Sequence, residues 1–509
     1  MADERRSGRA HVAEAVADPA AEPLAQKRKA GSSSTLLLLS VLTGVLLFPV
    51  ALGSSQMIFN DGDVSWHIAT GQWILQHHAI PRTDPFSFTW AGKPWVPIEW
   101  LAEVIYASAY SFAGYSGVSG VVTAALIALN GIVFFNALRW SRRVSSPLVT
   151  LVALDLVLIP MMLARPHLLA WPIMAGWIWL MLWARERNRA PPIWAALVMT
   201  LWANLHGSFV FGLALIGPFA LEALLADRGQ AFRTIRDWGL FGLASVAASL
   251  ITPNGLEGFL HPFAIMGMGS LQEIGEWRSA DFSQLGLFEI VLLEALFFCL
   301  WLGVRIPPLR LLLLLALLHM ALQHTRHQPV FLVLAALLSA RELATAIAAA
   351  FPARETKPAP SLPPRYAAAA VLAMLCLVVG LRLGFQVERR DDPLSPMRAL
   401  AAVPVGLRAQ PVYNDYLFGG YLIFAGVKPY IDGRADMYGD AFLLNYTSMK
   451  NSSPQRVQAE LDRRGAQWTI LQSTSRVAAM LDRSPQWMRI WSDRIAIVHV
   501  RRAALLQPQ

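Results

Sequence analysis

The chain has 509 residues, of which 55% are hydrophobic and only 15% are charged, and its mean hydropathy is +0.43. These values exclude an ordinary soluble protein, and the length suffices for about ten membrane spans and an additional domain. The net charge of +9 does not indicate nucleic-acid binding, because the basic residues lie mainly in short segments between apolar runs. Cys299 and Cys376 lie inside apolar runs, so they indicate neither a disulfide framework nor a thiolate metal site.

The first 34 residues are Ala-rich and charged, and residues 1–34 are predicted to be a disordered cytoplasmic tail. The first apolar run begins at Thr35, after the basic cluster Lys27-Arg28-Lys29. We interpret this run as an uncleaved signal anchor whose N-terminal side lies in the cytoplasm.

Eleven apolar runs predict a polytopic α-helical membrane domain over residues 35–384, although several runs are shorter than the usual ~20 residues. The runs are 35–53, 118–138, 146–164, 167–184, 191–205, 208–226, 238–252, 287–304, 309–323, 328–346 and 366–384. Alternation from a cytoplasmic N-terminus gives the cytoplasmic segments most of the arginines, as the positive-inside rule requires. The amphipathic stretch 99–114 is therefore assigned to an interfacial helix, because counting it as a span would place Arg139, Arg142 and Arg143 outside.

This topology predicts two long loops on the outer face, residues 54–117 and 252–286. After Gly384 the composition becomes mixed, with short β-like runs between helix-like stretches. Residues 385–509 are therefore predicted to form a small extracytoplasmic α/β domain, which is large enough for its own core. The expected location is the inner (cytoplasmic) membrane of a bacterium, with this domain in the periplasm.

The first outer loop carries Asp61-Gly62-Asp63 shortly after the first span, followed by Trp66 and His67. Asp-Gly-Asp is also a common turn sequence. Carboxylates held at a membrane surface can act as a general base or as metal ligands. Glycosyl transfer from a lipid phosphate needs one base, which takes the proton of the attacking acceptor hydroxyl. We predict Asp63 as this base and Asp61 as its partner, leave a divalent metal at the pair open, and assign Trp66 and His67 to substrate binding.

Three turns on the predicted outer face join later spans and contain histidine. Arg165 and Arg326 are predicted to hold a lipid phosphate, because guanidinium groups match phosphate oxygens bidentately. His167, His206 and His327 are predicted to contact the substrate, since imidazole can donate or relay a proton. Interface anchoring and helix capping are the alternative interpretation of these turns.

The second outer loop is charged over residues 272–281, and it could close over the first loop as a lid. Glu276 and Arg278 of this loop are predicted to contact the substrate. In the C-terminal domain, residues 432–439 (DGRADMYG) are expected either to serve a turn or to contact an acceptor or saccharide while facing the membrane domain.

The first outer loop contains the motifs DGDVSWH (61–67), GQWIL (71–75), IPRTDPFS (80–87), GKPW (92–95) and EWL (99–101). These motifs resemble those of the GT-C superfamily of integral-membrane glycosyltransferases, and in particular a group of largely uncharacterised bacterial members. This superfamily contains the protein O-mannosyltransferases and the aminoarabinose transferases of lipid A. The resemblance implies a GT-C-like fold, juxtamembrane helices in the first loop, and a catalytic role for the early acid, which falls on Asp63 first and Asp61 second.

The functional hypothesis is an inverting, membrane-embedded glycosyltransferase that uses a polyprenyl-phosphate sugar donor and modifies an extracytoplasmic lipid, polysaccharide or protein. No cofactor is expected for this reaction beyond the divalent metal left open above, and no nucleic acid is an expected partner. One alternative is a glycolipid transporter or flippase that uses Asp155, Glu289 and Glu294, acids expected to face the protein interior because they are costly in lipid. Another is a non-catalytic protein of envelope polysaccharide assembly.

Overall fold

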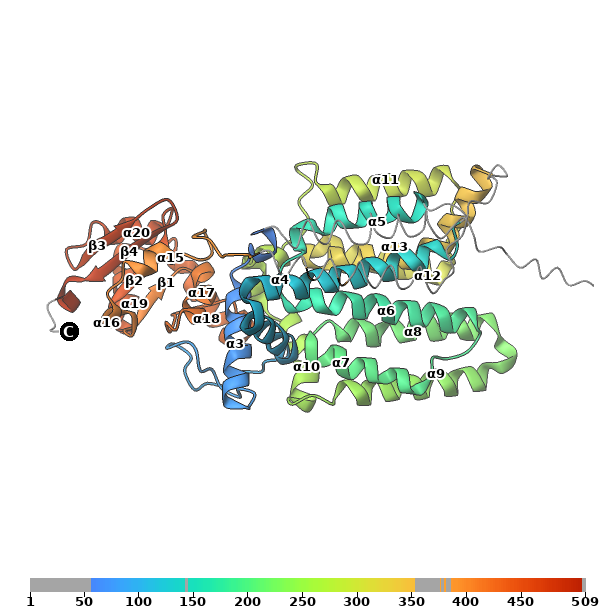
Figure 1. Cartoon of the computed structure of the whole chain (residues 1–509), viewed down its shortest axis with the longest axis horizontal. Helices are drawn as coiled ribbons and strands as arrows, with labels where there is room; N and C mark the ends of the chain where they lie inside the picture. Colours follow the sequence, from blue (N-terminus) through green and yellow to red (C-terminus); the bar gives the residue numbers. More distant parts are fainter. Residues whose placement is uncertain (1–55, 142–144, 353–375, 377–379, 381–385, 506–509) are drawn as a thin grey trace, which may run out of the picture.

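The computed structural model describes residues 56–141, 145–352, 376, 380 and 386–505. The predicted tail and the first predicted span lie outside the described residues, as does nearly all of the last predicted span. The described chain has a helical domain and a smaller α/β domain, placed end to end (Figure 1).

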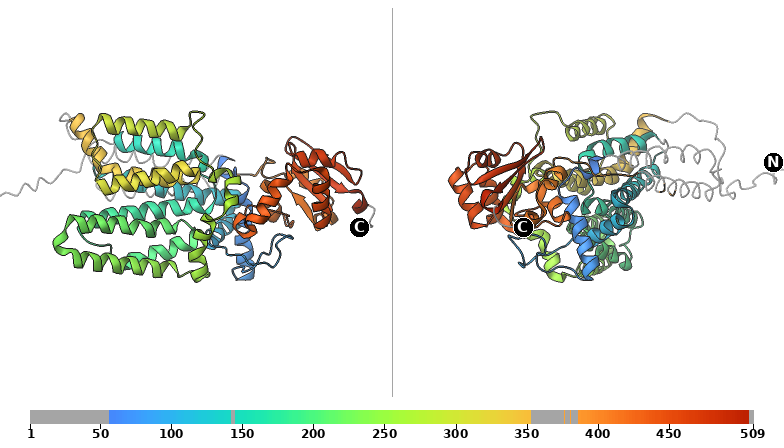
Figure 2. Two further views of the ribbon diagram at one scale, coloured as in Figure 1. Left: turned by 180° about the vertical axis from the view of Figure 1, so that it is seen from behind. Right: turned by 60° about the vertical axis from the view of Figure 1, so that its left-hand side comes forward.

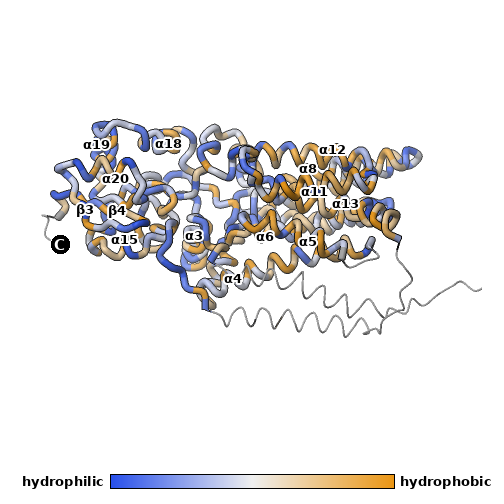
Figure 3. The backbone as a smooth tube through the Cα atoms, turned by 90° about the horizontal axis from the view of Figure 1, so that it is seen from above, coloured by the Kyte–Doolittle hydropathy of each residue, from blue (hydrophilic) through white to orange (hydrophobic). Residues whose placement is uncertain are grey.

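Each predicted span between residues 118 and 346 coincides with a helix of the described chain. These helices are α4 (Trp100–Leu138), α5 (Ser145–Leu158), α6 (Pro166–Glu186), α7 (Leu197–Leu205), α8 (Phe209–Ala226), α9 (Ala231–Ser249), α11 (Leu287–Trp301), α12 (Pro308–Gln323) and α13 (Gln328–Ala350). Apolar residues dominate most of them (Figure 3). Among the described residues, four stretches are long and apolar enough to cross a membrane: α4, α6, α8 and Thr325–Ala350, which contains α13. The protein is therefore a multi-pass membrane protein, but the count of eleven spans stays a prediction.

Helix α4 contains both the predicted interfacial helix and the predicted span that follows it. Its backbone is non-helical at Ala113 (φ −145°) and Gly114 (φ 57°). Glycine suits Gly114 because a side chain disfavours positive φ. The first arm of α4 packs against α3 (Asp63–His77). The ambiguous stretch is thus one arm of a kinked helix.

Short helices fill the two long loops and the connections between the membrane-domain helices. The first loop contains η2 (Gln56–Phe59) and α3, and the second contains α10 (Gly255–Met266), η6 (Gly269–Glu273) and η7 (Gly275–Trp277). The other connections contain η3 (Ile159–Met161), η4 (Ile193–Ala196), η5 (Arg228–Gln230) and η8 (Thr325–His327). Helix α3 lies across the ends of the membrane-domain helices, between them and the C-terminal domain (Figures 1 and 2).

The C-terminal domain is built on a four-stranded sheet in the order β1-β2-β4-β3. Strand β1 (Val412–Asn414) is parallel to β2 (Trp468–Gln472), while β4 (Ala496–Arg501) runs antiparallel to both β2 and β3 (Trp487–Ser492). The helices are α15 (Met397–Ala401), α16 (Val405–Arg408), α17 (Gly419–Phe424), α18 (Ala435–Met449), α19 (Pro454–Arg463) and α20 (Arg476–Leu481), with η9 (Tyr416–Phe418) and η10 (Arg502–Leu505). The predicted α/β architecture of this region is confirmed.

One hydrophobic cluster crosses the boundary between the two domains. Trp66 and Trp95 of the first loop are buried in the same cluster as Tyr430, Tyr438 and Phe442 of the C-terminal domain. Because burying large aromatic side chains is strongly favourable, this shared core fixes the C-terminal domain on the first loop. The candidate site lies at this junction.

Candidate active site

The Asp-Gly-Asp sequence forms the turn into α3 and also supplies two carboxylates to the site. Asp63 is the first residue of α3, and its backbone N–H donates to Asp61 Oδ1 at 2.7 Å. Trp66, one helical turn later, donates its indole N–H to Asp63 Oδ1 at 3.0 Å. The turn therefore aims the Asp63 carboxylate, while the helix presents Trp66 to hold it.

Arg165 joins three acidic side chains that are far apart in the sequence. Its guanidinium group lies 3.0 Å from Asp63 Oδ2, 3.4 Å from Asp61 Oδ2 and 3.0 Å from Glu276 Oε2. Arg326 lies 3.4 Å from the other oxygen of Glu276 and stacks over the ring of Trp277 at 4.1 Å. Five residues predicted for the site, from three separate segments and the second loop, thus form one ionic cluster.

The pKa values of Asp63 and Glu276, two carboxylates of this cluster, are shifted in opposite directions. Burial raises the pKa of Asp63 to about 7, although Arg165 opposes the shift and Asp61 adds to it. Burial alone would also raise the pKa of Glu276, but Arg165 and Arg326 hold it at about 2. Near neutral pH, Glu276 is therefore a fixed counter-ion for two arginines, whereas Asp63 can accept a proton.

Two cavities meet at the ionic cluster. The first has a volume of about 390 Å³ and lies between α3 and the C-terminal domain, with Asp63 and His67 in its wall. The second has a volume of about 350 Å³ and is more apolar, with Trp171 and Phe211 in its wall. The residues common to both walls are Ile98, Glu99, Arg165, Ile265, Glu276, Trp277 and Arg326. The charged cluster is thus a partition between a polar and an apolar compartment.

Glu99 was not predicted as a site residue, yet it lies in this partition between two predicted histidines. Its carboxylate is 3.3 Å from His206 Nε2 and 3.8 Å from His67 Nε2. Burial raises the pKa of Glu99 to about 8, and burial lowers the pKa of His67 well below its usual range. Glu99 is therefore a neutral hydrogen-bonding acid near pH 7. The available signal in the sequence was the motif EWL (99–101), which begins with Glu99.

The remaining predicted residues divide between the second cavity and the outside of the site. His167 and His327 line the apolar cavity, and His167 donates its Nε2–H to the carbonyl oxygen of Met161 at 2.9 Å. Arg278 lines neither cavity. Its side chain is exposed and folds back on its own loop, where Nε donates to the carbonyl oxygen of Gln272 at 3.0 Å.

The acids that a transporter would use are separate from these cavities. Asp155 is buried and accepts a hydrogen bond from Asn130 at 2.9 Å, and it lines neither cavity. Glu294 is exposed on α11, so the expectation that it faces the interior is wrong. Helix α11 packs through Phe288, Val291 and Leu292, and Glu294 lies outside this packed face.

The C-terminal domain completes the first cavity. Tyr416, Gly433 and Asp436 are in its wall, and Asp436 accepts a hydrogen bond from His261 of the second loop at 2.8 Å. The expectation that segment 432–439 faces the membrane domain agrees with this arrangement. The individual residues were not predicted, because contacts between distant segments leave no local pattern.

A divalent metal does not fit the acidic pair as it is arranged. Asp61 and Asp63 both pair with Arg165, whose guanidinium group takes the position of a cation. In the part of the chain that the structure describes, no group of three or more histidine, cysteine or acidic side chains could hold a metal ion. A divalent ion at Asp61 and Asp63 would therefore have to displace the guanidinium group of Arg165.

Comparison with known proteins supports the fold. No protein-family model matches the chain, and no curated protein matches its sequence. The apo oligosaccharyltransferase of Archaeoglobus fulgidus is similar in structure, with a TM-score of 0.57 and 11% identity over 87% of this chain and 71% of that one. ArnT of Cupriavidus metallidurans bound to undecaprenyl phosphate has a TM-score of 0.52 and 12% identity, over 94% of this chain and 100% of that one.

Both similar proteins are GT-C glycosyltransferases. The chain has a GT-C-like fold. The resemblance found in the first outer loop is thereby confirmed at the level of the fold. Because fold alone does not establish activity, the function is argued from the site.

Proposed function

We propose that the chain is a membrane glycosyltransferase that moves a sugar from a polyprenyl-phosphate donor to an acceptor hydroxyl, with inversion at the anomeric carbon. The contact between Asp63 and Arg165, 3.0 Å long and located where a polar and an apolar cavity meet, carries the proposal. A base beside a cation at this junction suits a reaction between a lipid-linked phosphate and a polar acceptor.

The proposed reaction is a single displacement. Asp63 takes the proton of the acceptor hydroxyl. The oxygen of that hydroxyl attacks the anomeric carbon, and the bond from this carbon to the phosphate oxygen breaks. The electron pair leaves with the lipid phosphate, which needs no strong acid. A pKa of about 7, raised by burial, gives Asp63 the basicity that this role needs near neutral pH.

Arg165 and Arg326 are the proposed phosphate ligands. Glu276 contacts both guanidinium groups and so keeps them side by side at the partition. Guanidinium groups bind phosphate through paired, charge-assisted hydrogen bonds. The undecaprenyl phosphate bound to ArnT supports the choice of ligand, since that protein shares the fold.

The lipid and the sugar are assigned to different cavities. The apolar wall that contains Trp171, Met174 and Phe211 would take the first isoprenoid units, with His167 and His327 next to the phosphate. The polar cavity, with Trp66 and His67 in its wall, would bind the sugar and the acceptor. His206 lines the apolar cavity and would act through its contact with Glu99 in the shared wall.

We further propose that the site faces the outside of a bacterial cytoplasmic membrane, with the N-terminus inside and the C-terminal domain outside. Helix α6 begins beside Arg165 at the site and ends at Arg185 and Arg187. At that far end Arg139 pairs with Glu186 and Arg310 pairs with Glu222, so arginines gather opposite the site. The positive-inside rule assigns such an end to the cytoplasm. The acceptor would be an envelope lipid, polysaccharide or protein.

The test is mass spectrometry of glycolipids and envelope polysaccharides from cells that carry the wild type, a deletion, or Asp63→Asn at matched expression. Loss of the same sugar in both mutants, with accumulation of its donor lipid, is the expected result. A deletion phenotype that Asp63→Asn restores to wild type would contradict the proposed base. A matched Asp155→Asn strain tests the transporter alternative, which predicts the larger defect in that strain.

A further inference from the structure

Segment 429–440, which leads into α18 and forms its first turn, contacts both outer loops. The Thr89 hydroxyl of the first loop donates to the Tyr430 carbonyl oxygen at 2.7 Å. Asp440 accepts hydrogen bonds from two backbone N–H groups of the second loop, including that of Ser270 at 2.9 Å. One short segment of the C-terminal domain therefore ties together the two loops that form the site.

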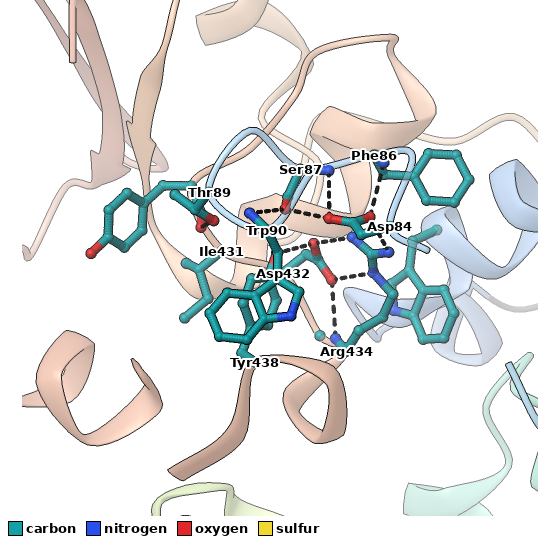
Figure 4. Close-up of polar contacts among 12 residues, drawn as sticks. Asp84, Phe86, Ser87, Thr89, Trp90, Ile431, Asp432, Arg434 and Tyr438 are labelled. Carbon is teal, nitrogen blue, oxygen red and sulfur yellow. Dashed lines mark hydrogen bonds and ion pairs between the residues drawn. The ribbon is translucent and has the colours of Figure 1, made fainter. Parts of the chain in front are cut away.

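A sealed ionic network holds this segment on the first loop (Figure 4). Arg434 donates to Asp84 Oδ1 at 2.7 Å and to both oxygens of Asp432, at 2.8 and 2.7 Å. The exposed fractions of these three side chains are only 0–1%. The Tyr438 hydroxyl donates to Asp432 at 2.6 Å, and the Ser87 backbone N–H donates to Asp84 at 3.1 Å. Because buried charges are costly unless they are paired, these contacts favour the position of the segment in which all of the groups have partners.

The residue next to Arg434 touches the proposed base. A Cβ atom added to Gly433 would lie 1.7 Å from Asp63 Oδ1, and one added to Gly420 would lie 2.0 Å from the carbonyl oxygen of Gly62. Both positions therefore accept only glycine without displacement of the Asp61-Gly62-Asp63 turn. Gly433 of the C-terminal domain thus lies against the Asp63 carboxylate on one side, and Arg165 pairs with this carboxylate on another.

We propose that Arg434 and Asp84 are positioning residues: their ion pair seats segment 429–440 so that Gly433 fixes the carboxylate of Asp63 beside Arg165. The C-terminal domain then determines the geometry of the base without contributing a reacting group. The expected effect on transfer rests on the proposed function, whereas the positioning of segment 429–440 by the ion pair does not. Displacement of the base by about 1 Å can lower the reaction rate about 100-fold, so the position of segment 429–440 directly affects the rate.

Two variants of the full-length protein test the proposal independently. Asp84→Asn removes the charge that crosses between the segments and keeps the network of Arg434, Asp432 and Tyr438 inside the C-terminal domain. Gly433→Ala leaves the ion pair intact and displaces Asp63 directly. Gly406→Ala is the matched control, because a Cβ atom at this position of the same domain meets nothing within 4 Å. Arg501→Lys is a second control, which alters an arginine contact between β4 and α19 far from the site.

The first measurement is hydrogen–deuterium exchange, which needs no substrate. Asp84→Asn should raise exchange in residues 82–95 and in the first turn of α3, and Gly433→Ala should raise it in that turn alone. Neither control should change it. Unaltered exchange in both test variants would overturn the proposal, even in a protein that proves to have no transferase activity.

The second measurement separates catalysis from binding. Both test variants should lower the transfer rate constant kcat by about 100-fold. Their affinity for undecaprenyl phosphate should stay within about twofold of the wild type, because Arg165 and Arg326 remain in place. Wild-type kcat in variants with raised exchange would overturn the positioning role. Equal losses of kcat and undecaprenyl-phosphate affinity would also overturn it, since they indicate general disruption.

Discussion

Two arginine–carboxylate clusters lie close together in this protein, and they differ in access to solvent. In the cluster of Arg165, Asp63 and Glu276, the side chains are 17–31% exposed, and two cavities reach them. In the cluster of Arg434, Asp84 and Asp432, the side chains are at most 1% exposed. The same chemical groups can therefore bind a ligand where a cavity opens onto them, and can fix a domain where they are sealed.

The largest expected effect tests the open cluster. Asp63→Asn should lower sugar transfer by about 10²–10⁴-fold, because the amide cannot accept the acceptor proton. Thermal unfolding should change little, since the amide keeps the size of the side chain and a hydrogen-bond acceptor for Trp66. Transfer assays and thermal scans on the same detergent-solubilised preparations check this. Transfer within about tenfold of the wild type would remove Asp63 from the role of base.

The next effect tests the sealed cluster. Arg434→Ala should destabilise the protein by about 3–5 kcal/mol, because two buried carboxylates lose their counter-ion. Arg165→Ala should cost less stability, since water can reach the acids that it leaves behind. Denaturant unfolding of the two variants compares them directly. Equal losses in the free energy of unfolding would show that the difference in exposure between the two clusters does not affect stability.

The pH dependence of the transfer rate tests whether Asp63 of the open cluster titrates as the base. Burial raises the pKa of Asp63 to about 7, so below this value the base is mostly protonated and inactive. The rate should rise about tenfold per pH unit below the pKa and level off above it. Steady-state rates of the wild type and of Arg278→Ala should follow one profile, because Arg278 lies outside both cavities. A flat wild-type profile across this range would contradict the assignment.

The smallest expected effect concerns the phosphate. Arg326→Lys should weaken undecaprenyl phosphate binding by about tenfold, because one ammonium cannot reproduce a bidentate guanidinium contact. Arg278→Lys is the matched control in the second loop and should bind as the wild type does. Binding to purified protein in detergent measures both. An equal loss in the two variants would show that the effect is not specific to the guanidinium group of Arg326.

The sequence predicted the elements and the side chains that have a local or topological signature. The apolar runs identified the helices. The alternation of inner and outer segments, fixed by the positions of the arginines, placed Arg165, Glu276 and Arg326 on the same face as Asp63. Glu99 was missed as a site residue because it was assigned to an interfacial helix and to the motif EWL (99–101), with no chemical role. The helix α10 within the second loop was also not predicted.

The pairing of Asp84 with Arg434 lay beyond the reach of a single sequence. The two residues are 350 positions apart, and each occurs in a stretch whose composition also suits a simple turn. Arg278 was placed in the site because charge was the only guide to the loop, whereas the actual backbone turns its side chain onto Gln272. Tertiary contacts decided these cases, and sequence periodicity does not encode them.

The shared wall between the two cavities has a kinetic consequence for the proposed reaction. Its two substrates would come from different phases, a lipid that diffuses within the two dimensions of a bilayer and an acceptor at its aqueous surface. Turnover would then depend on the surface density of one substrate and on the local supply of the other. Enrichment of either substrate alone would soon saturate its own compartment, so flux would follow whichever phase is depleted.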